Sequence, residues 1–533
     1  MFYVGYNEGV CYSGLRDRCA VLRWWIAQIG LFLTVFAIVA LSGPGRIDIV
    51  DGQTRYEVAR SLVDHSDLII RDPDVWFAVF PGRDGQLYTK YRFPQSALGV
   101  AAIYIADSTG RMSEFRRHFF FVLTSAVACA ILAVSYAAVF RRLGHQPRAA
   151  LLWAMAGIFC TPSWFFGTST FDDILGSVAV VIAVTAALTC RQCHPRAGAI
   201  IAGLAMGLAF NCKEPLGIFV LPVLAAIYDP HLDRRAQQSR LVTVITLLAV
   251  GIAVYKGYDL YKFPPGSTAG HAEIMKKYCP VWSGTPEIAL LAMLFSLSTG
   301  VFYYNPPIVV CLSGLAGWWN SERLFCRSLM VAIAVFVLFI SSLTFFKGDP
   351  AWGPRYLTPI FAILWIFAPS GARLVRRWVL VAVLGLGMVV QIGALCIDPH
   401  RLYIEHGLPS SFYVNSTLLY FHPSISHLVN RPREIVEVLS SQDKQAERYS
   451  PSPSPTFAFP VIDLVEKGPA AIRKYHVLKG LRFWWASFQY LNYSSRPVEI
   501  ARSVIFLAVV AVTGLTFQVF GARTATVKHI SAS

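Results

Sequence analysis

The chain has 533 residues, of which 55% are hydrophobic and only 15% carry a charged side chain. With a mean hydropathy of +0.50, this is far more apolar material than a soluble domain needs, which argues against an ordinary soluble protein. The formal net charge of +16 arises mostly from short Lys and Arg clusters between apolar runs. That distribution is typical of the cytoplasmic loops of a polytopic membrane protein, and not of a nucleic-acid-binding face.

Apolar runs and basic clusters predict about twelve transmembrane helices. Arginines before the first span, at about 22–42, place the N-terminus in the cytoplasm, so the loop at 43–117 is external. Within this loop the apolar run 96–106 is too short to cross a bilayer, and we expect an amphipathic helix that is interfacial or re-entrant on the same side. Other predicted spans include about 118–140, 149–166, 197–211, 216–228 and 503–520.

Three polar clusters fall in loops that the charge pattern places outside. They surround Asp51, Asp172 and Arg355, and each belongs to a different external loop. A transporter of lipids or solutes, the alternative function, would carry its ionisable residues near the middle of its spans. Clustering in loops on one side therefore favours an enzyme.

The first external loop contains the groups needed to transfer a group from a lipid phosphate. A carboxylate, either Asp51 or Asp48 three residues earlier, can deprotonate an acceptor hydroxyl. Lysine and arginine at the membrane surface can bind a phosphate anchored in the bilayer and stabilise the charge that builds on it as it departs. Asp48 and Asp51 are both candidates for the general base.

The run from Asp51 to Arg60, Asp-Gly-Gln-Thr-Arg-Tyr-Glu-Val-Ala-Arg, resembles the first external loop of the GT-C membrane glycosyltransferases. It is particularly similar to the aminoarabinose transferases and protein mannosyltransferases. The resemblance covers about 20–370 and implies an all-α, GT-C-like bundle and an inverting transfer from a polyprenyl-phosphate sugar. Blocks that resemble bacterial lipid-carrier-dependent members are Gly82–Tyr91, Thr170–Asp173, Leu204–Pro222, Ser298–Pro307 and Trp352–Pro359.

The resemblance also implies roles for individual residues. Asp51 takes the position of the general base, with Asp48 as its rival, and Lys90 takes that of a lysine near the lipid phosphate. Asp172 or Asp173 supplies an acid from the second external loop. Further candidates for phosphate binding are Arg355, Arg83 and Arg92, and the residues expected to shape the substrate site are Arg55, Tyr56, Tyr91, Trp352 and Tyr356.

The chain departs from the family pattern at two positions. Gly52 stands where relatives often carry a second acid, which keeps a catalytically inactive scaffold of the same fold as an alternative. Thr89 stands before Lys90, where the aminoarabinose enzymes have a glutamate, and a plausible metal ligand is thereby lost. No metal-binding residue or cofactor is therefore assigned, and the use of a divalent metal stays open.

The expected organisation has three parts. Residues 1–396 form the transmembrane module, 397–500 an external segment of unknown role, and 501–533 the last helix and a cytoplasmic tail. We expect a multi-pass protein of a bacterial inner (plasma) membrane, with its active site facing outside. Its expected partners are membrane lipid and a polyprenyl-phosphate sugar, with no nucleic acid. The sequence determines neither the sugar nor the acceptor.

Overall fold

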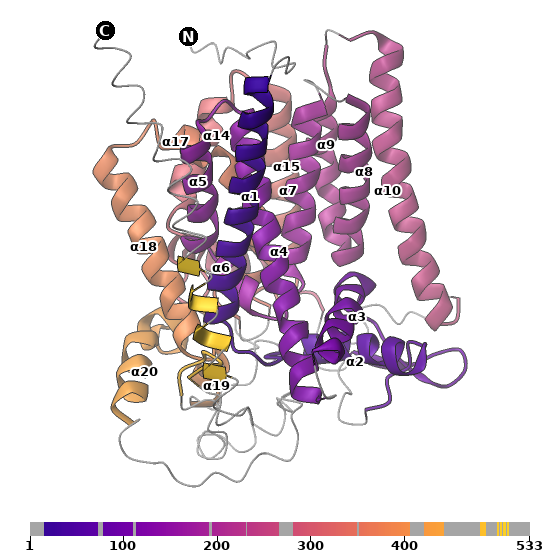
Figure 1. Cartoon of the computed structure of the whole chain (residues 1–533), viewed down its shortest axis with the longest axis vertical. Coiled ribbons are helices and arrows are strands. Elements are labelled where there is room, and N and C mark those ends of the chain that lie inside the picture. The colour runs from indigo at the N-terminus through magenta and orange to yellow at the C-terminus, as the bar shows by residue number, and fades with distance from the viewer. Residues whose placement is uncertain are drawn as a thin grey trace.

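The chain folds into a helical bundle with short helices and loops gathered at one end (Figure 1). The computed structural model describes residues 15–72, 78–109, 113–190, 195–230, 232–265, 281–348, 351–405, 420–441, 480–486 and parts of 498–510. The predicted span at 503–520 lies mostly outside the described residues, as does most of the external segment at 397–500.

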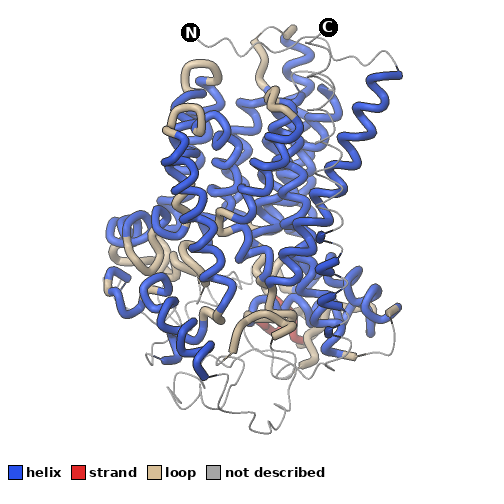
Figure 2. Tube along the Cα trace, turned by 60° about the vertical axis from the view of Figure 1, so that its left-hand side comes forward, coloured by secondary structure: helices blue, strands red, loops and turns tan. Residues whose placement is uncertain are grey.

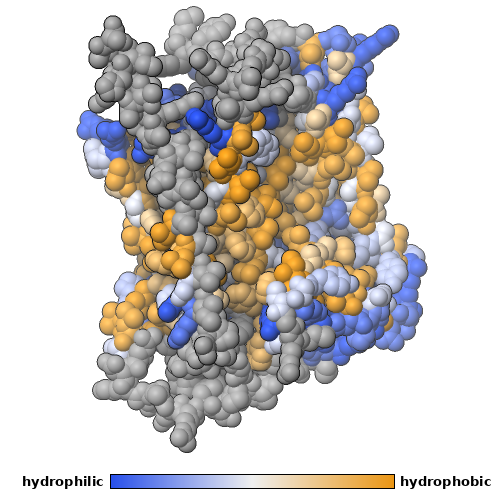
Figure 3. Space-filling view, in the orientation of Figure 1, coloured by the Kyte–Doolittle hydropathy of each residue, from blue (hydrophilic) through white to orange (hydrophobic). Residues whose placement is uncertain are grey.

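Within the part of the chain that the structure describes, six helices are long and apolar enough to cross a membrane, and shorter apolar helices pack among them. Apolar side chains form a band around the middle of the molecule, with hydrophilic residues towards both ends (Figure 3). This distribution supports a multi-pass membrane protein. The six are α1 (Leu15–Ser42, of which Val21–Ser42 is the candidate span), α4 (Glu114–Arg142), α8 (Pro195–Cys212), α10 (Arg234–Lys262), α15 (Arg323–Ser341) and α18 (Arg377–Cys396).

The shorter elements complete the bundle and its polar end. They are α5 (Pro147–Phe159), α6 (Ser163–Thr168), α7 (Asp173–Cys190), η1 (Glu214–Phe219), α9 (Val220–Ile227), α12 (Pro286–Phe295), α13 (Val301–Tyr304), α14 (Ile308–Trp318), η2 (Arg355–Leu357), α16 (Thr358–Leu364), η3 (Trp365–Phe367), α17 (Ala368–Gly371), α19 (His400–Glu405), η6 (Pro423–Ile425) and α20 (His427–Ser441).

Close helix packing in this bundle depends on small residues. Helices α8 and α10 approach so closely that a Cβ atom added at Gly251 would lie 2.5 Å from the Cα atom of Gly207. Side chains cannot fit at such a contact, and small residues at helix interfaces are typical of membrane helices.

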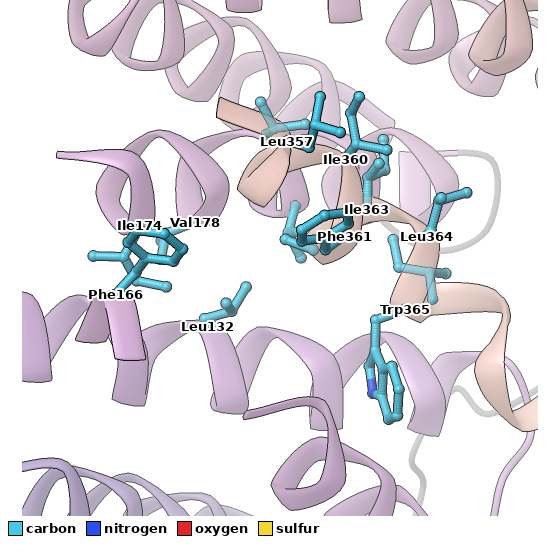
Figure 4. Packing of buried hydrophobic residues seen from close by; sticks show 14 of the residues in the cluster. Leu132, Phe166, Ile174, Val178, Leu357, Ile360, Phe361, Ile363, Leu364 and Trp365 are labelled. Atoms are coloured by element: carbon cyan, nitrogen blue, oxygen red, sulfur yellow. The ribbon is translucent and has the colours of Figure 1, made fainter. Parts of the chain in front are cut away.

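A buried apolar cluster joins α4, α6, α7 and α16 (Figure 4). Leu132 of α4 and Phe166 of α6 pack near Ile174 of α7, and Phe361 of α16 belongs to the same cluster. This packing matters for function because Asp173 begins α7 and Arg355 begins the short η2 helix just before α16. The core thereby fixes two helix starts that carry charged side chains.

The first external loop forms a compact unit at one end of the bundle. It contains α2 (Val50–His65), α3 (Phe93–Ser108) and an antiparallel hairpin of β1 (Val79–Pro81) and β2 (Leu87–Thr89), in which Val79 pairs with Thr89. The hairpin, red in Figure 2, lies at the same end as α2 and α3. The short apolar run at 96–106 is helical, as predicted, and forms most of α3.

Two sequence-based boundaries were wrong. The span expected at 149–166 is not continuous, because α5 ends at Phe159 and α6 begins at Ser163. Pro162 lies between them, and proline lacks the amide hydrogen that a continuous helix needs. The sequence also predicts an external loop at about 257–287, but α10 continues to Lys262, so this loop begins later.

Candidate active site

Asp51 lies in the first turn of α2, where a carboxylate interacts favourably with the helix N-terminus. Its side chain is buried and faces residues from two distant parts of the chain. The Tyr91 hydroxyl donates to Asp51 Oδ1, and Arg355 Nη2 donates to Asp51 Oδ2 at 3.1 Å. The structure therefore brings the loop at 43–117 together with the polar loop before α16. The charge pattern predicted one side of the membrane for both loops but did not require them to meet.

The segment around the start of α7 contributes two more buried acids to the same cluster. Arg355 Nε donates to Asp173 Oδ2 at 2.8 Å, while Arg55 Nη2 donates to Asp172 Oδ2 at 2.9 Å. Lys213, just after α8, pairs with Asp173 and lies 3.6 Å from Asp172 Oδ1. We call this set the acid–cation cluster, and its members are Asp51, Asp172, Asp173, Arg55, Lys213 and Arg355.

The positive and negative charges of this buried cluster offset one another, which lowers the free-energy cost of burying them. Burial alone would raise the pKa of Asp172, but the cations Arg55, Lys213 and Arg355 outweigh that effect and hold its pKa below the ordinary value. Burying charges is costly unless each is paired. The neighbouring cations thereby favour the ionised form of Asp172.

Aromatic rings line the cations of the cluster. Arg55 Cζ lies 4.3 Å from the ring centroid of Tyr91, and Lys213 Nζ lies 4.8 Å from that of Tyr356. Among the three cations, Lys213 is the most accessible, with 20% of its side chain exposed compared with 3% for both Arg55 and Arg355. Lys213 is thus the best placed of the three to contact an incoming anion.

Asp48, the rival for the general base, is fully occupied. Its Oδ1 accepts from the amide and the hydroxyl of Thr170 at 3.1 and 2.8 Å. Its Oδ2 accepts from Ser169 Oγ and Arg482 Nη2, each at 2.8 Å. A carboxylate offers about four lone-pair sites. These four donors therefore leave Asp48 no site for an acceptor hydroxyl, which favours Asp51 as the base.

Three of the candidate phosphate ligands gather around the end of α10, apart from the contacts of the acid–cation cluster. Lys90 Nζ lies 4.0 Å from the ring centroid of Phe263, and Arg83 Nε donates to the carbonyl of Phe263 at 3.1 Å. Arg92 donates to both carboxylate oxygens of Asp259 at 3.1 Å. The fourth candidate, Arg355, instead bonds to Asp51 and Asp173.

Two of the residues expected to shape the substrate site point elsewhere. The Tyr56 hydroxyl donates to Glu114 Oε1 at 2.6 Å, at the start of α4. Trp352 packs against Tyr304, with ring centroids 5.2 Å apart, and near His427 at 5.8 Å. Arg55, Tyr91 and Tyr356 do lie at the acid–cation cluster.

Sequence reasoning missed two residues, Lys213 and Arg482. Lys213 belongs to an external turn between two predicted spans, and its charge in that turn was the available signal. Arg482 lies in the external segment, for which no resemblance could be named, and no sequence pattern links it to Asp48. Its ion pair joins residues that are 434 positions apart.

Metal binding was tested against the donor groups at the site. Among the described residues, no group of three or more His, Cys, Asp or Glu side chains is arranged to hold a metal ion. Asp51, Asp172 and Asp173 each pair with Arg or Lys instead. We therefore derive no step through a metal.

Glu57, on α2, makes the stability of this unit depend on pH. Burial raises its pKa from 4.5 to about 8, although Arg60 lies 3.2 Å away. Because the folded state disfavours the ionised carboxylate, stability is lost as the pH rises from about 4.5 to about 8. Replacing Glu57 with Gln should therefore raise the melting temperature more at about pH 9 than at about pH 5. Thermal unfolding at both values checks this, and an equal change at both would contradict it.

Comparison with known proteins gives matches only among solved structures. No protein-family model matches the chain, and neither does any curated protein. The crystal structure of ArnT from Cupriavidus metallidurans in the apo state matches with a TM-score of 0.46 and 14% identity, over 95% of this chain and 78% of that one. The Archaeoglobus fulgidus oligosaccharyltransferase in complex with zinc and sulfate matches with a TM-score of 0.38 and 12% identity, over 75% of this chain and 61% of that one.

The TM-scores and identities are too low to transfer a residue role or a substrate. The side chains of this chain are therefore what indicates its function.

Proposed function

We propose that the protein is an inverting glycosyltransferase that moves a sugar from a polyprenyl-phosphate donor to an acceptor hydroxyl on the outer face of the membrane. The acceptor is a lipid, a glycan or a protein. The observation that carries the proposal is the buried cluster in which Asp51 meets Arg355 and Tyr91. Asp51 and Arg55 lie within the first six residues of α2, and the other ionisable members of the cluster lie at or beside the ends of helices.

Topology supports an external site. The proposed arrangement is a GT-C-like bundle of about twelve transmembrane helices, with 43–117 as the catalytic loop and 501–533 as the last helix and a cytoplasmic tail. Asp51 follows α1, Asp173 begins α7 and Lys213 follows α8. Under the positive-inside rule all three helix ends face outside. A transporter would instead need ionisable residues along its spans.

In the proposed reaction, Asp51 acts as general base. It takes the proton of the acceptor hydroxyl as the acceptor oxygen attacks the anomeric carbon. The bond between the anomeric carbon and the phosphate oxygen breaks, and polyprenyl phosphate leaves with the electron pair. Attack opposite to the leaving group inverts the anomeric centre.

Cations stabilise the departing phosphate in this scheme. Lys213 is the accessible cation beside the acids, and Lys90 with Arg83 and Arg92 offers positive charge next to the end of α10. Arg355 holds Asp51 and Asp173 in place. In this scheme the cations bind the phosphate of the donor, and the sugar of the donor reaches Asp51.

The test is release of polyprenyl phosphate from a panel of synthetic polyprenyl-phosphate sugars by the purified protein in lipid nanodiscs. We expect turnover of at least one donor when lipid, glycan and peptide acceptors are supplied. If a folded protein turns over no donor with any acceptor, the proposal is wrong, and a transporter or an inactive GT-C scaffold becomes the better reading. Flux of a labelled donor across proteoliposomes then separates those two.

A further inference from the structure

A short piece of the external segment, residues 480–486, is inserted beside the first external loop. The amide of Arg482 donates to the carbonyl of Cys396 at 2.8 Å, and the amide of Trp484 donates to that of Gly43 at 3.1 Å. The indole Nε1 atoms of Trp484 and Trp485 donate to backbone carbonyls of α1, each at 2.9 Å. Backbone and side-chain bonds thus fix this piece to the end of α1 and the end of α18.

From this position the side chain of Arg482 reaches the loop that precedes Asp172 and Asp173. Its side chain is buried, and Nη1 donates to Thr168 Oγ1 at 2.9 Å while Nη2 donates to Asp48 Oδ2 at 2.8 Å. Asp48 in turn accepts from Ser169 and Thr170. A single guanidinium therefore connects the external segment to 168–170 both directly and through Asp48.

The segment 168–170 also contacts α2 and α3. A Cβ atom at Gly52 would lie 2.1 Å from Thr170 Oγ1, so the first turn of α2 packs directly against Thr170. Gln95 Nε2 donates to the Thr170 carbonyl at 3.0 Å. Gly52, where relatives often have an acid, is thus the contact that lets α2 meet this segment.

From these contacts we propose that Arg482 is a positioning residue: through Asp48 and 168–170 it sets where Asp172 and Asp173 lie relative to Asp51. The external segment thereby completes the candidate active site from a distant part of the chain. The catalytic part of this inference rests on the proposed function. Arg482 itself does not contact the reacting atoms in this scheme.

The geometry explains why this role requires arginine. The fork of the guanidinium makes two bonds at once, to a carboxylate and to a hydroxyl, whereas the ammonium of lysine is a single point charge. Removing the guanidinium leaves Asp48 buried without its ion-pair partner. The segment that leads into Asp172 then loses a fixed anchor.

The first arm of the test compares kinetics. Replacing Arg482 with Met should lower kcat by about 10- to 100-fold while KM for the donor changes little, because small displacements of catalytic groups cost rate. Replacing Arg482 with Lys should recover part of that loss. The matched control is Arg433→Met, since Arg433 is an exposed arginine of the same external segment that pairs with Glu437 at 3.5 Å, and it should keep the wild-type kcat.

A purely structural role predicts a different result. In that case Arg482→Met would reduce the yield of folded protein, but the folded fraction would keep the wild-type kcat, and this would overturn the inference. In a double-mutant cycle, Arg482→Met and Asp48→Asn should be strongly non-additive, because they break the same link. Fully additive losses would also overturn it.

The second arm of the test measures hydrogen exchange and does not depend on enzymatic turnover. The Thr170 amide donates to Asp48 Oδ1, so hydrogen exchange of a peptide that spans 168–173 should be faster in Arg482→Met than in wild type or Arg433→Met. Unchanged exchange overturns the inference. If no donor is turned over by wild type, the proposed function fails, and the exchange result by itself decides whether Arg482 holds this segment.

Discussion

Replacing Asp51 with Asn should lower kcat by about 10²- to 10⁴-fold, the contribution expected of a general base. This corresponds to about 3 to 5 kcal/mol of transition-state stabilisation. Asn keeps the size of the side chain: its carbonyl oxygen can accept from Arg355, and its amide nitrogen can donate to the Tyr91 hydroxyl oxygen, so folding should be preserved. Release of polyprenyl phosphate by variant and wild type, each in lipid, provides the measurement.

The matched control for this prediction is Asp48→Asn. Asp48 is saturated by donors from Ser169, Thr170 and Arg482. Its replacement should reduce kcat less than that of Asp51, because it acts through the positions of other residues. If Asp51→Asn retained full activity while Asp48→Asn were inactive, the base would be Asp48.

Helix boundaries and loop sides follow from local features of the sequence. Apolar runs long enough to span a membrane and basic clusters at their inner ends determine which loops share a side. That reasoning placed Asp51, Asp172 and Arg355 on one side, and the structure brings their side chains into one cluster. The sequence could also have predicted the break at Pro162, because proline interrupts helices.

The sequence did not predict which side chains of the site contact each other. Lys90, Tyr91 and Arg92 are consecutive, yet Tyr91 contacts Asp51 while Lys90 and Arg92 contact residues of α10 or just beyond it. Alternate side chains of an extended segment point in opposite directions, but the sequence does not say which direction faces the acids. The choice of Arg482 as partner of Asp48 depends on tertiary packing between the two ends of the chain.

Replacing Arg355 with Met should have the largest effect on stability. Arg355 is buried and bonds to Asp51 Oδ2 at 3.1 Å and Asp173 Oδ2 at 2.8 Å. Removing one partner of a buried ion pair leaves an uncompensated charge and typically costs about 3 to 5 kcal/mol. Thermal unfolding in lipid should therefore show a marked fall in the melting temperature, and activity should be lost with it.

Two further variants separate charge from shape in this prediction. Arg355→Lys keeps the charge but cannot reach both carboxylates with a planar fork, so it should recover stability only in part. Adding Asp173→Asn to Arg355→Met removes one of the two carboxylates that have lost Arg355, and should restore some of the lost stability without restoring activity. If Arg355→Met unfolded at the wild-type temperature and kept its turnover, the bridge between Asp51 and Asp173 would be neither structural nor functional. Another residue would then have to hold the acid–cation cluster together. Lys213, which pairs with Asp173, would be the next residue to replace.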